Sequence, residues 1–103
     1  MTELTTHVLD AASGRPAAGM AVAVRTAGAV VATAATDADG RAALGALGAG
    51  EHTLVFDTGA WFAARGVEAF YPSVAVAFRV DGEPHAHVPL LLSPFAYSTY
   101  RGS

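Results

Sequence analysis

The chain has 103 residues, a formal net charge of −3, 52 % hydrophobic and 15 % charged residues, and no cysteine. This length predicts a single domain over residues 1–103, and the apolar content excludes intrinsic disorder. Lysine is absent and the arginines are scattered, which argues against nucleic-acid binding through the phosphates. The lack of cysteine excludes disulfides, thiolate metal sites and a thiol nucleophile.

The chain carries no segment that resembles a signal peptide or a membrane span. Its N-terminal region lacks a basic stretch followed by an apolar one, and its apolar runs are short and broken by Gly or Asp. We therefore expect a cytoplasmic protein without a membrane partner. A domain of this size has little room for a deep pocket of its own, so a small-molecule site would form more easily between subunits.

Short apolar and β-branched runs alternate with turn residues along the whole chain. They predict strands at Thr5–Asp10, Met20–Thr26, Val30–Thr36, Arg41–Leu44, His52–Asp57, Ser73–Val80, His85–Leu92 and Phe95–Tyr100. Loops or turns are expected at Ser13–Pro16, Asp37–Gly40, Gly45–Gly50 and Asp81–Pro84. Ala60–Arg65 is expected to form one short helix that Gly66 ends. About eight strands at intervals of roughly ten residues predict an all-β, antiparallel sandwich.

Histidines are the most informative candidates for chemistry. His85 and His87 lie two residues apart in a predicted strand, so they share one face, and the apolar residues that follow point to the core on the other. His7 faces outward in the same way, because Val8 is the natural inward residue of its strand. Three interpretations stay open: solvated surface groups, ligands of a metal such as zinc, or a general acid and base.

Arginine and serine side chains offer further candidates. Arg41 begins a short strand after a turn, where its guanidinium either closes a hairpin at the surface or clamps an anion or oxyanion. Arg101 has the same two interpretations. A Ser–His–Asp triad can be drawn with Ser98 or Ser103, but no nucleophile elbow surrounds either serine, so we discount a triad.

Several segments spread over the whole chain form a recognisable combination. They are Leu4–Asp10, Gly14–Ala18, Thr36–Arg41, Phe70–Pro72, His85–Pro94 and Tyr100–Ser103. In these segments the chain resembles the 5-hydroxyisourate hydrolases, which are transthyretin-like proteins, and the last two segments are the most specific. The resemblance implies a transthyretin-like sandwich of two four-stranded sheets with one short helix. It also implies a homotetramer with active sites at the dimer–dimer interface.

The activity implied by the resemblance is hydrolysis of 5-hydroxyisourate to 2-oxo-4-hydroxy-4-carboxy-5-ureidoimidazoline in urate breakdown, with neither a metal nor another cofactor. The catalytic set of the family carries over to His7, Arg41 and His87. Two histidines and an arginine can supply the base, the acid and the oxyanion donor that this hydrolysis needs, and which histidine is the base stays open. Substrate-binding positions carry over to His85, Ser98, Tyr100, Arg101, Gly102 and Ser103.

Two other functions remain open at this stage. One is a non-catalytic small-ligand carrier of the same fold, although the resemblance implies that carriers lack the histidines and arginine present here. The other is a β-sandwich binding module, a class that Gly14–Leu54 also fits. The sequence departs from the family at Ala86, where many relatives have an aromatic residue, and in Arg25–Thr36, which is short and indicates a trimmed hairpin.

Overall fold

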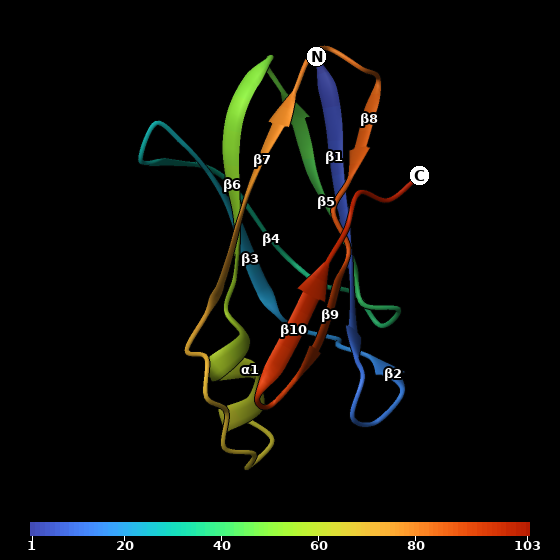
Figure 1. The fold of residues 1–103 in the computed structure, drawn as a ribbon, viewed down its shortest axis with the longest axis vertical. Coiled ribbons are helices and arrows are strands. Elements are labelled where there is room, and N and C mark those ends of the chain that lie inside the picture. The colour runs from blue at the N-terminus through green and yellow to red at the C-terminus, as the bar shows by residue number, and fades with distance from the viewer.

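The computed structural model describes residues 1–103, and its two β-sheets face each other across one hydrophobic core (Figure 1). The strands are β1 (Thr2–Asp10), β2 (Arg15–Pro16), β3 (Ala21–Thr26), β4 (Ala29–Ala35), β5 (Arg41–Leu47), β6 (Gly50–Phe56), β7 (Val74–Val80), β8 (His85–His87), β9 (Leu90–Ser93) and β10 (Ala96–Thr99). One short helix, α1 (Thr58–Ala63), follows β6. Its six residues are too few to cross a membrane.

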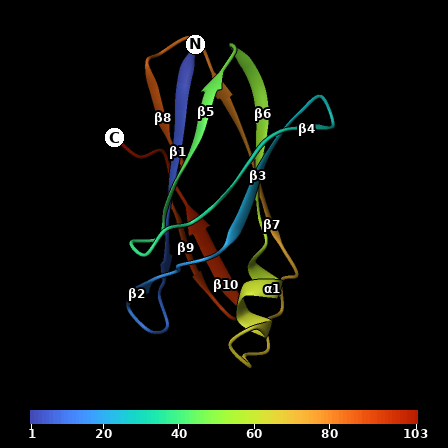
Figure 2. The same cartoon turned by 180° about the vertical axis from the view of Figure 1, so that it is seen from behind.

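The first sheet is organised around the long strand β1. Strands β5 and β8 flank the N-terminal part of β1, strands β2 and β9 flank its C-terminal part, and β10 extends the sheet beyond β9. The second sheet has the order β4-β3-β6-β7. Figure 2 shows the same two layers from behind, with the C-terminal segment beside β8 and β1.

Strand alternation turns one side of each sheet toward the core. In β1 the side chains of Leu4 and Val8 are fully buried, and in β6 of the second sheet Leu54 and Phe56 are fully buried too. Each side chain of this size stabilises the fold by roughly 1.5–3 kcal/mol when it leaves water. The same alternation leaves the outer side of the first sheet free for polar side chains, and the candidate site lies there.

The all-β sandwich with one short helix is confirmed, but it is not wholly antiparallel. Strands β8 and β9 run parallel to β1, whereas all the other pairs are antiparallel. The chain reaches β8 from β7, which belongs to the other sheet. No tight hairpin therefore sets the direction of β8, and a parallel pairing becomes possible.

The predicted strand His85–Leu92 is divided into β8 and β9. Pro89 stands at the break, where its missing N–H would leave a gap in the ladder of hydrogen bonds. The alternation continues across the break, because the histidines stay on the outer side while Leu90 and Leu92 are buried. Together with the two-residue strand β2, this division gives the first sheet six strand segments instead of the expected four.

The loop predicted at Gly45–Gly50 is much shorter in the structure, because β5 continues to Leu47 and β6 begins at Gly50. Gly45 has a φ of +87°, next to a register shift between β5 and β1. A glycine in this left-handed conformation forms a bulge that bends a strand without ending it. Strand β1 also begins three residues earlier than predicted, at Thr2.

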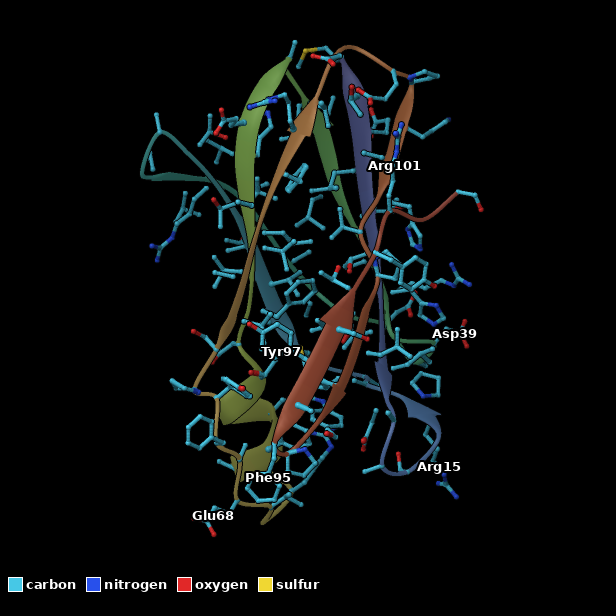
Figure 3. The ribbon with its side chains drawn as sticks, in the orientation of Figure 1. Arg15, Asp39, Glu68, Phe95, Tyr97 and Arg101 are labelled. Carbon is cyan, nitrogen blue, oxygen red and sulfur yellow. The ribbon has the colours of Figure 1, made fainter.

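Helix α1 begins and ends two residues earlier than the predicted Ala60–Arg65. Gly66 closes it as expected, with a φ of +70° and with the N–H of Val67 donating to the carbonyl of Phe62. The helix lies at the end of the sandwich near the β9–β10 turn, where Phe95 is labelled in Figure 3. The loop predicted at Ser13–Pro16 is wrong for its last two residues, which form β2 because they pair with Leu9 and Asp10 of β1. The remaining boundaries differ from the prediction by at most two residues.

Candidate active site

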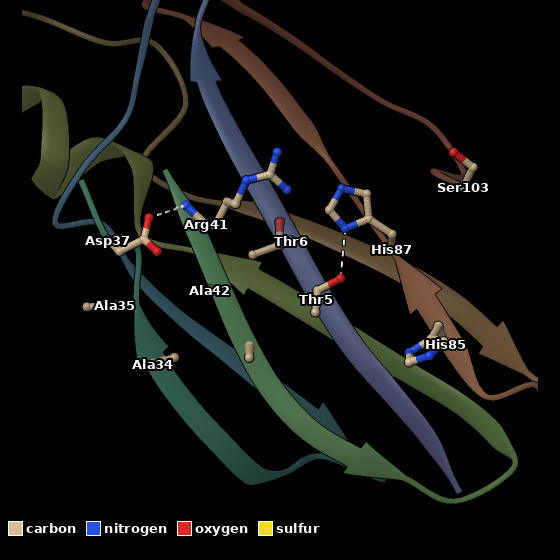
Figure 4. A pocket seen from close by; sticks show the side chains of 11 residues that line it. Thr5, Thr6, Ala34, Ala35, Asp37, Arg41, Ala42, His85, His87 and Ser103 are labelled. Atoms are coloured by element: carbon tan, nitrogen blue, oxygen red, sulfur yellow. Dashed lines mark hydrogen bonds between the residues drawn. The ribbon is translucent and has the colours of Figure 1, made fainter. Parts of the chain in front are cut away.

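The outer side of the first sheet gathers the three residues of the predicted catalytic set. His7 on β1 lies directly opposite Arg41 on β5. Thr5, two residues earlier on β1, lies directly opposite His87 on β8. Thr5 and His7 share a face of β1 because residues two apart on a strand point to the same side. Their partners therefore lie on that face too, with Arg41 of β5 on one flank of β1 and His87 of β8 on the other (Figure 4).

Two cavities divide the other candidates between them. The first has a volume of about 610 Å³ and is lined in part by Arg41 and Thr5. The second has a volume of about 500 Å³ and is lined in part by Tyr100–Gly102. Both cavities share His85, His87 and Ser103, so the ring of His87 stands at the boundary between them.

Two of the predicted residues line neither cavity. His7 is paired in register with Arg41, which lines the first cavity, but His7 itself does not line it. Ser98 is exposed in β10, where it pairs with Leu91 of β9, two strands away from β1. Ser98 does not line either cavity, and its substrate-binding role stays a prediction.

The turn between β4 and β5 sets the direction of Arg41. An oxygen of the Asp37 carboxylate accepts hydrogen bonds from the N–H groups of Asp39 at 2.9 Å and Arg41 at 3.0 Å. Gly40 has a φ of +76°, and a Cβ at this position would overlap the carbonyl oxygen of Val8. Glycine is therefore required here, and Arg41 leaves the turn toward the outer side of the sheet.

The same turn fixes a proton on His7. Nε2 of this ring lies 2.9 Å from the carbonyl oxygen of Asp39. A carbonyl oxygen can only accept a hydrogen bond, so Nε2 carries the hydrogen. In the neutral ring Nδ1 is then the free acceptor, and His7 can exchange a proton with a substrate only at Nδ1.

His87 is held from two directions. Its Nδ1 lies 2.8 Å from the hydroxyl oxygen of Thr5. Its backbone carbonyl accepts a hydrogen bond of 2.8 Å from the N–H of Gly102, and a Cβ on Gly102 would overlap Cδ2 of the ring. The C-terminal segment can therefore pack on this ring only because residue 102 is glycine.

The surroundings of His87 favour its neutral form. Burial lowers the pKa of His87, and the positive charge of Arg41 and the neighbouring His7 lower it further. The ring therefore stays neutral at a pH where an ordinary histidine begins to gain a proton. A neutral imidazole beside a guanidinium has the chemistry of a general base that works next to an oxyanion donor.

The C-terminal segment is also attached to the turn before β8, close to where Figure 3 labels Arg101. A nitrogen of the Arg101 guanidinium lies 3.8 Å from a carboxylate oxygen of Glu83. Backbone N–H groups of Asp81 and Glu83 lower the pKa of the Glu83 carboxyl, which keeps it charged. Exposed ion pairs of this kind contribute little energy, so the backbone bond of Gly102 is the firmer attachment.

The geometry does not favour the metal interpretation of the histidines. No group of three or more His, Asp or Glu side chains is arranged to hold a metal ion. One nitrogen of His7 is bonded to a carbonyl oxygen and one nitrogen of His87 to a hydroxyl. His85 shares their side of the sheet but is exposed and makes no side-chain hydrogen bond. The arrangement suits proton transfer better than metal binding.

Sequence reasoning did not single out Thr5 or Asp37, which hold His87 and Arg41 in place. For Thr5 a signal existed, since it lies two residues before His7 and shares its face. For Asp37 the signal was its place at the start of a turn, where Asp side chains bond to nearby backbone N–H groups. The pairing of Thr5 with His87 required the register between two distant strands, which no local pattern reveals.

The fold and this site define a transthyretin-type sandwich with histidine and arginine on the outer side of one sheet. Residues 4–102 match the HIUase/Transthyretin family, and the chain belongs to it. A relative from Caulobacter vibrioides named 5-hydroxyisourate hydrolase is 48 % identical over 115 residues, which cover 100 % of both chains. The solved structure of the Klebsiella pneumoniae 5-hydroxyisourate hydrolase matches with a TM-score of 0.95 and 42 % identity, covering 100 % of both chains.

The fold is shared with a protein of a different kind. Sea bream transthyretin, solved in complex with thyroxine, matches with a TM-score of 0.89 and 35 % identity, covering 96 % of this chain and 93 % of that chain. The chain is thus similar in fold to a hydrolase and to a protein that binds thyroxine. Because one fold can serve several functions, the side chains of the site must separate the two.

Proposed function

We propose that the chain hydrolyses 5-hydroxyisourate to 2-oxo-4-hydroxy-4-carboxy-5-ureidoimidazoline, working as one domain over residues 1–103. The observation that carries this proposal is the placement of His87 and Arg41 on the two strands that flank β1, where both side chains line the first cavity. The names of the Caulobacter and Klebsiella relatives support the choice of substrate.

We assign His87 the part of the general base. As a water oxygen attacks a ring carbonyl of the substrate, Nε2 of His87 takes a proton from that water. The carbonyl becomes a tetrahedral oxyanion, which the guanidinium of Arg41 stabilises through its fork of N–H donors. Attack and stabilisation thus come from opposite flanks of β1.

Collapse of the tetrahedral intermediate completes the hydrolysis. The carbonyl re-forms as the C–N bond breaks, and the electron pair of that bond goes to the nitrogen. The leaving nitrogen takes a proton from the imidazolium of His87 or from a protonated His7 through Nδ1, which is the only nitrogen that His7 has free. The ring opens to a carboxylic acid, which releases its remaining proton to the solvent and becomes a carboxylate, and no redox change occurs.

Ligand carriage without chemistry is the alternative that the thyroxine-bound relative raises. A carrier needs shape and apolar contact from its site. A histidine with a lowered pKa next to an arginine adds nothing to such binding, because desolvating these polar groups costs free energy unless they are used. The pair is therefore better explained by hydrolysis.

The proposal includes the homotetramer with sites between subunits and the cytoplasmic location that we expect from the sequence. The first cavity opens on an outer sheet face that a second subunit could close. Strands β7 and β10 are sheet edges whose free backbone groups can pair with another chain. Near them, the side chains of Phe70 and Phe95 are exposed.

Activity and assembly can be tested together. The purified protein is added to 5-hydroxyisourate made from urate by urate oxidase, and the decay of its absorbance is followed. We expect decay faster than the spontaneous reaction at concentrations where sedimentation shows a tetramer. We also expect the rate per subunit to fall on dilution to monomers that keep their β-sheet circular dichroism. A rate no faster than spontaneous decay would contradict the hydrolase, and a fully active monomer would contradict the shared site.

A further inference from the structure

Thr5 is the side chain on this face whose contacts the proposed chemistry leaves unused. It is exposed on β1, and the only hydrogen bond of its hydroxyl is the one to Nδ1 of His87. The two strands are joined at this point by a backbone bond of 3.0 Å from the N–H of Val88 to the carbonyl of Thr5. The hydroxyl is therefore fixed relative to the His87 ring by the sheet itself.

The contacts around the ring decide which of its atoms can reach a substrate. Thr5 occupies Nδ1, and Gly102 lies against Cδ2 and Cγ. Nε2 and Cε1 are the ring atoms that remain, and in Figure 4 this open edge faces Arg41. Any proton that His87 takes from water must therefore go to Nε2.

A proton can be taken up at Nε2 only if the neutral ring carries its hydrogen on Nδ1. The ring then donates this hydrogen to the hydroxyl oxygen of Thr5. After proton uptake the imidazolium carries hydrogen on both nitrogens, so Thr5 must still accept. An accepting hydroxyl fits the ring both before and after proton transfer, whereas a donating one would place the hydrogen on Nε2 and remove the base.

The positive charge of Arg41 favours the same arrangement. A lone pair on Nε2 is attracted to a guanidinium, whereas an N–H at this position is repelled by it. We propose that Thr5 is a positioning residue, whose hydroxyl accepts the Nδ1–H of His87 and so keeps the basic lone pair on Nε2. This inference rests on the proposed function, since it assigns Thr5 its part in that reaction.

Thr5→Val removes the hydroxyl acceptor and keeps the backbone of residue 5 and the shape of its side chain, so the fold should be retained. We expect kcat for 5-hydroxyisourate to fall about tenfold, the cost of one hydrogen bond, with KM changed less than about twofold. The acid limb of the pH profile of kcat/KM should move to lower pH, because an acceptor at Nδ1 stabilises the imidazolium. Thr5→Ser should restore both the rate and the profile. Thr33→Val, which removes an exposed strand hydroxyl outside both cavities, is the matched control.

The tautomer of His87 can be read directly in the wild-type protein. Nitrogen-15 chemical shifts of its ring, recorded above its pKa, should show the hydrogen on Nδ1. A ring with its hydrogen on Nε2 would overturn the inference, and so would an active Thr5→Val variant with an unchanged rate and pH profile. If the wild-type protein fails to hydrolyse 5-hydroxyisourate, the proposed function is lost, and the chemical shifts still report the Thr5–His87 geometry separately.

Discussion

The chain contains two histidines that pair with a threonine through Nδ1, and they differ in what the other ring nitrogen does. Nδ1 of His52 lies 2.6 Å from the hydroxyl oxygen of Thr26, and Nε2 lies 2.7 Å from the carbonyl oxygen of Gly48. Only 7 % of His52 is exposed. His87 lies 2.8 Å from the hydroxyl of Thr5 and keeps Nε2 free. We call His52 the closed histidine, because both of its ring nitrogens are hydrogen-bonded, and His87 the open histidine, because only its Nδ1 is.

The two threonines also act in opposite directions. The carbonyl of Gly48 forces the hydrogen of His52 onto Nε2, so in the neutral ring Nδ1 accepts and Thr26 donates. In the arrangement that we infer for His87, Thr5 accepts. A histidine with both nitrogens satisfied and buried beside Phe78 has nothing left for chemistry. One with a single nitrogen anchored is held in place and remains reactive.

The largest expected effect is on activity, from removal of the open histidine. His87→Ala should lower kcat by about 10²- to 10⁴-fold, the usual contribution of a general base. Its melting temperature should stay close to that of the wild type, because the ring is only partly buried. Steady-state kinetics and thermal unfolding measured on one preparation test both parts, and an active His87→Ala protein would remove the distinction between the two histidines.

Loss of Arg41 should come next. Arg41→Ala should reduce kcat by about 10²- to 10³-fold, the typical cost of one oxyanion donor. The positive charge of Arg41 lowers the pKa of His87, so this pKa should rise in the variant and the acid limb of kcat/KM should move to higher pH. That shift is opposite to the one expected for Thr5→Val. Arg41→Lys is the matched variant, since it keeps the charge but loses the fork of donors. A pH profile that does not move would show that Arg41 does not act on His87.

Gly102→Ala should have an intermediate effect on activity. The new Cβ would overlap Cδ2 of His87, so the ring or the C-terminal segment has to move. A misplacement of about 1 Å at a group that takes part in the reaction can lower the rate about 10²-fold. Gly48→Ala is the control, because nothing lies within 4 Å of a Cβ at that position and its φ is not in the left-handed region. Equal rates for the two variants would mean that the packing of Gly102 on His87 does not matter.

The closed histidine should matter for stability instead. His52→Ala leaves the hydroxyl of Thr26 and the carbonyl of Gly48 without a partner and should lower the free energy of unfolding by about 2–3 kcal/mol. Differential scanning calorimetry should record a fall in melting temperature of roughly 10 °C. The kcat of the protein that remains folded should stay within about twofold of wild type. A stable but inactive His52→Ala variant would reverse the roles that we assign.

The lowered pKa of His87 should make the free energy of unfolding fall as the pH is lowered. The pKa of His87 in the folded protein is lowered, so the unfolded chain binds a proton on this residue more readily. The contribution of neutral His87 to stability is then complete above the pKa of the unfolded chain and is lost as the pH falls toward the folded value. Denaturant titrations at several pH values, compared with His87→Ala, should show this acid destabilisation only when His87 is present.

Local sequence patterns predicted on which side of their strand the candidate histidines lie. The contacts that hold these histidines depend on pairings between distant segments. Period-two alternation correctly placed His85 and His87 on the side of their strand that faces away from the core. It did not foresee the break at Pro89, since the expected strand is apolar on both sides of that residue.

The pairing of Thr5 with His87 could not be predicted, because it depends on the parallel register of two strands that are some 80 residues apart. The same is true of the contact between Gly102 and His87, which depends on the path of the C-terminal segment. The resemblance to a family pointed to the candidate residues, whereas only the structure shows what holds each of them. Those supporting contacts are the ones that distinguish an open histidine from a closed one.

The most direct test follows the absorbance of freshly generated 5-hydroxyisourate in the presence of wild-type, His87→Ala and His52→Ala proteins at equal folded concentrations. We predict rapid decay with the wild type and with His52→Ala, and decay close to the spontaneous rate with His87→Ala. Wild-type protein that does not accelerate the decay, or a His87→Ala variant as fast as the wild type, would contradict the account.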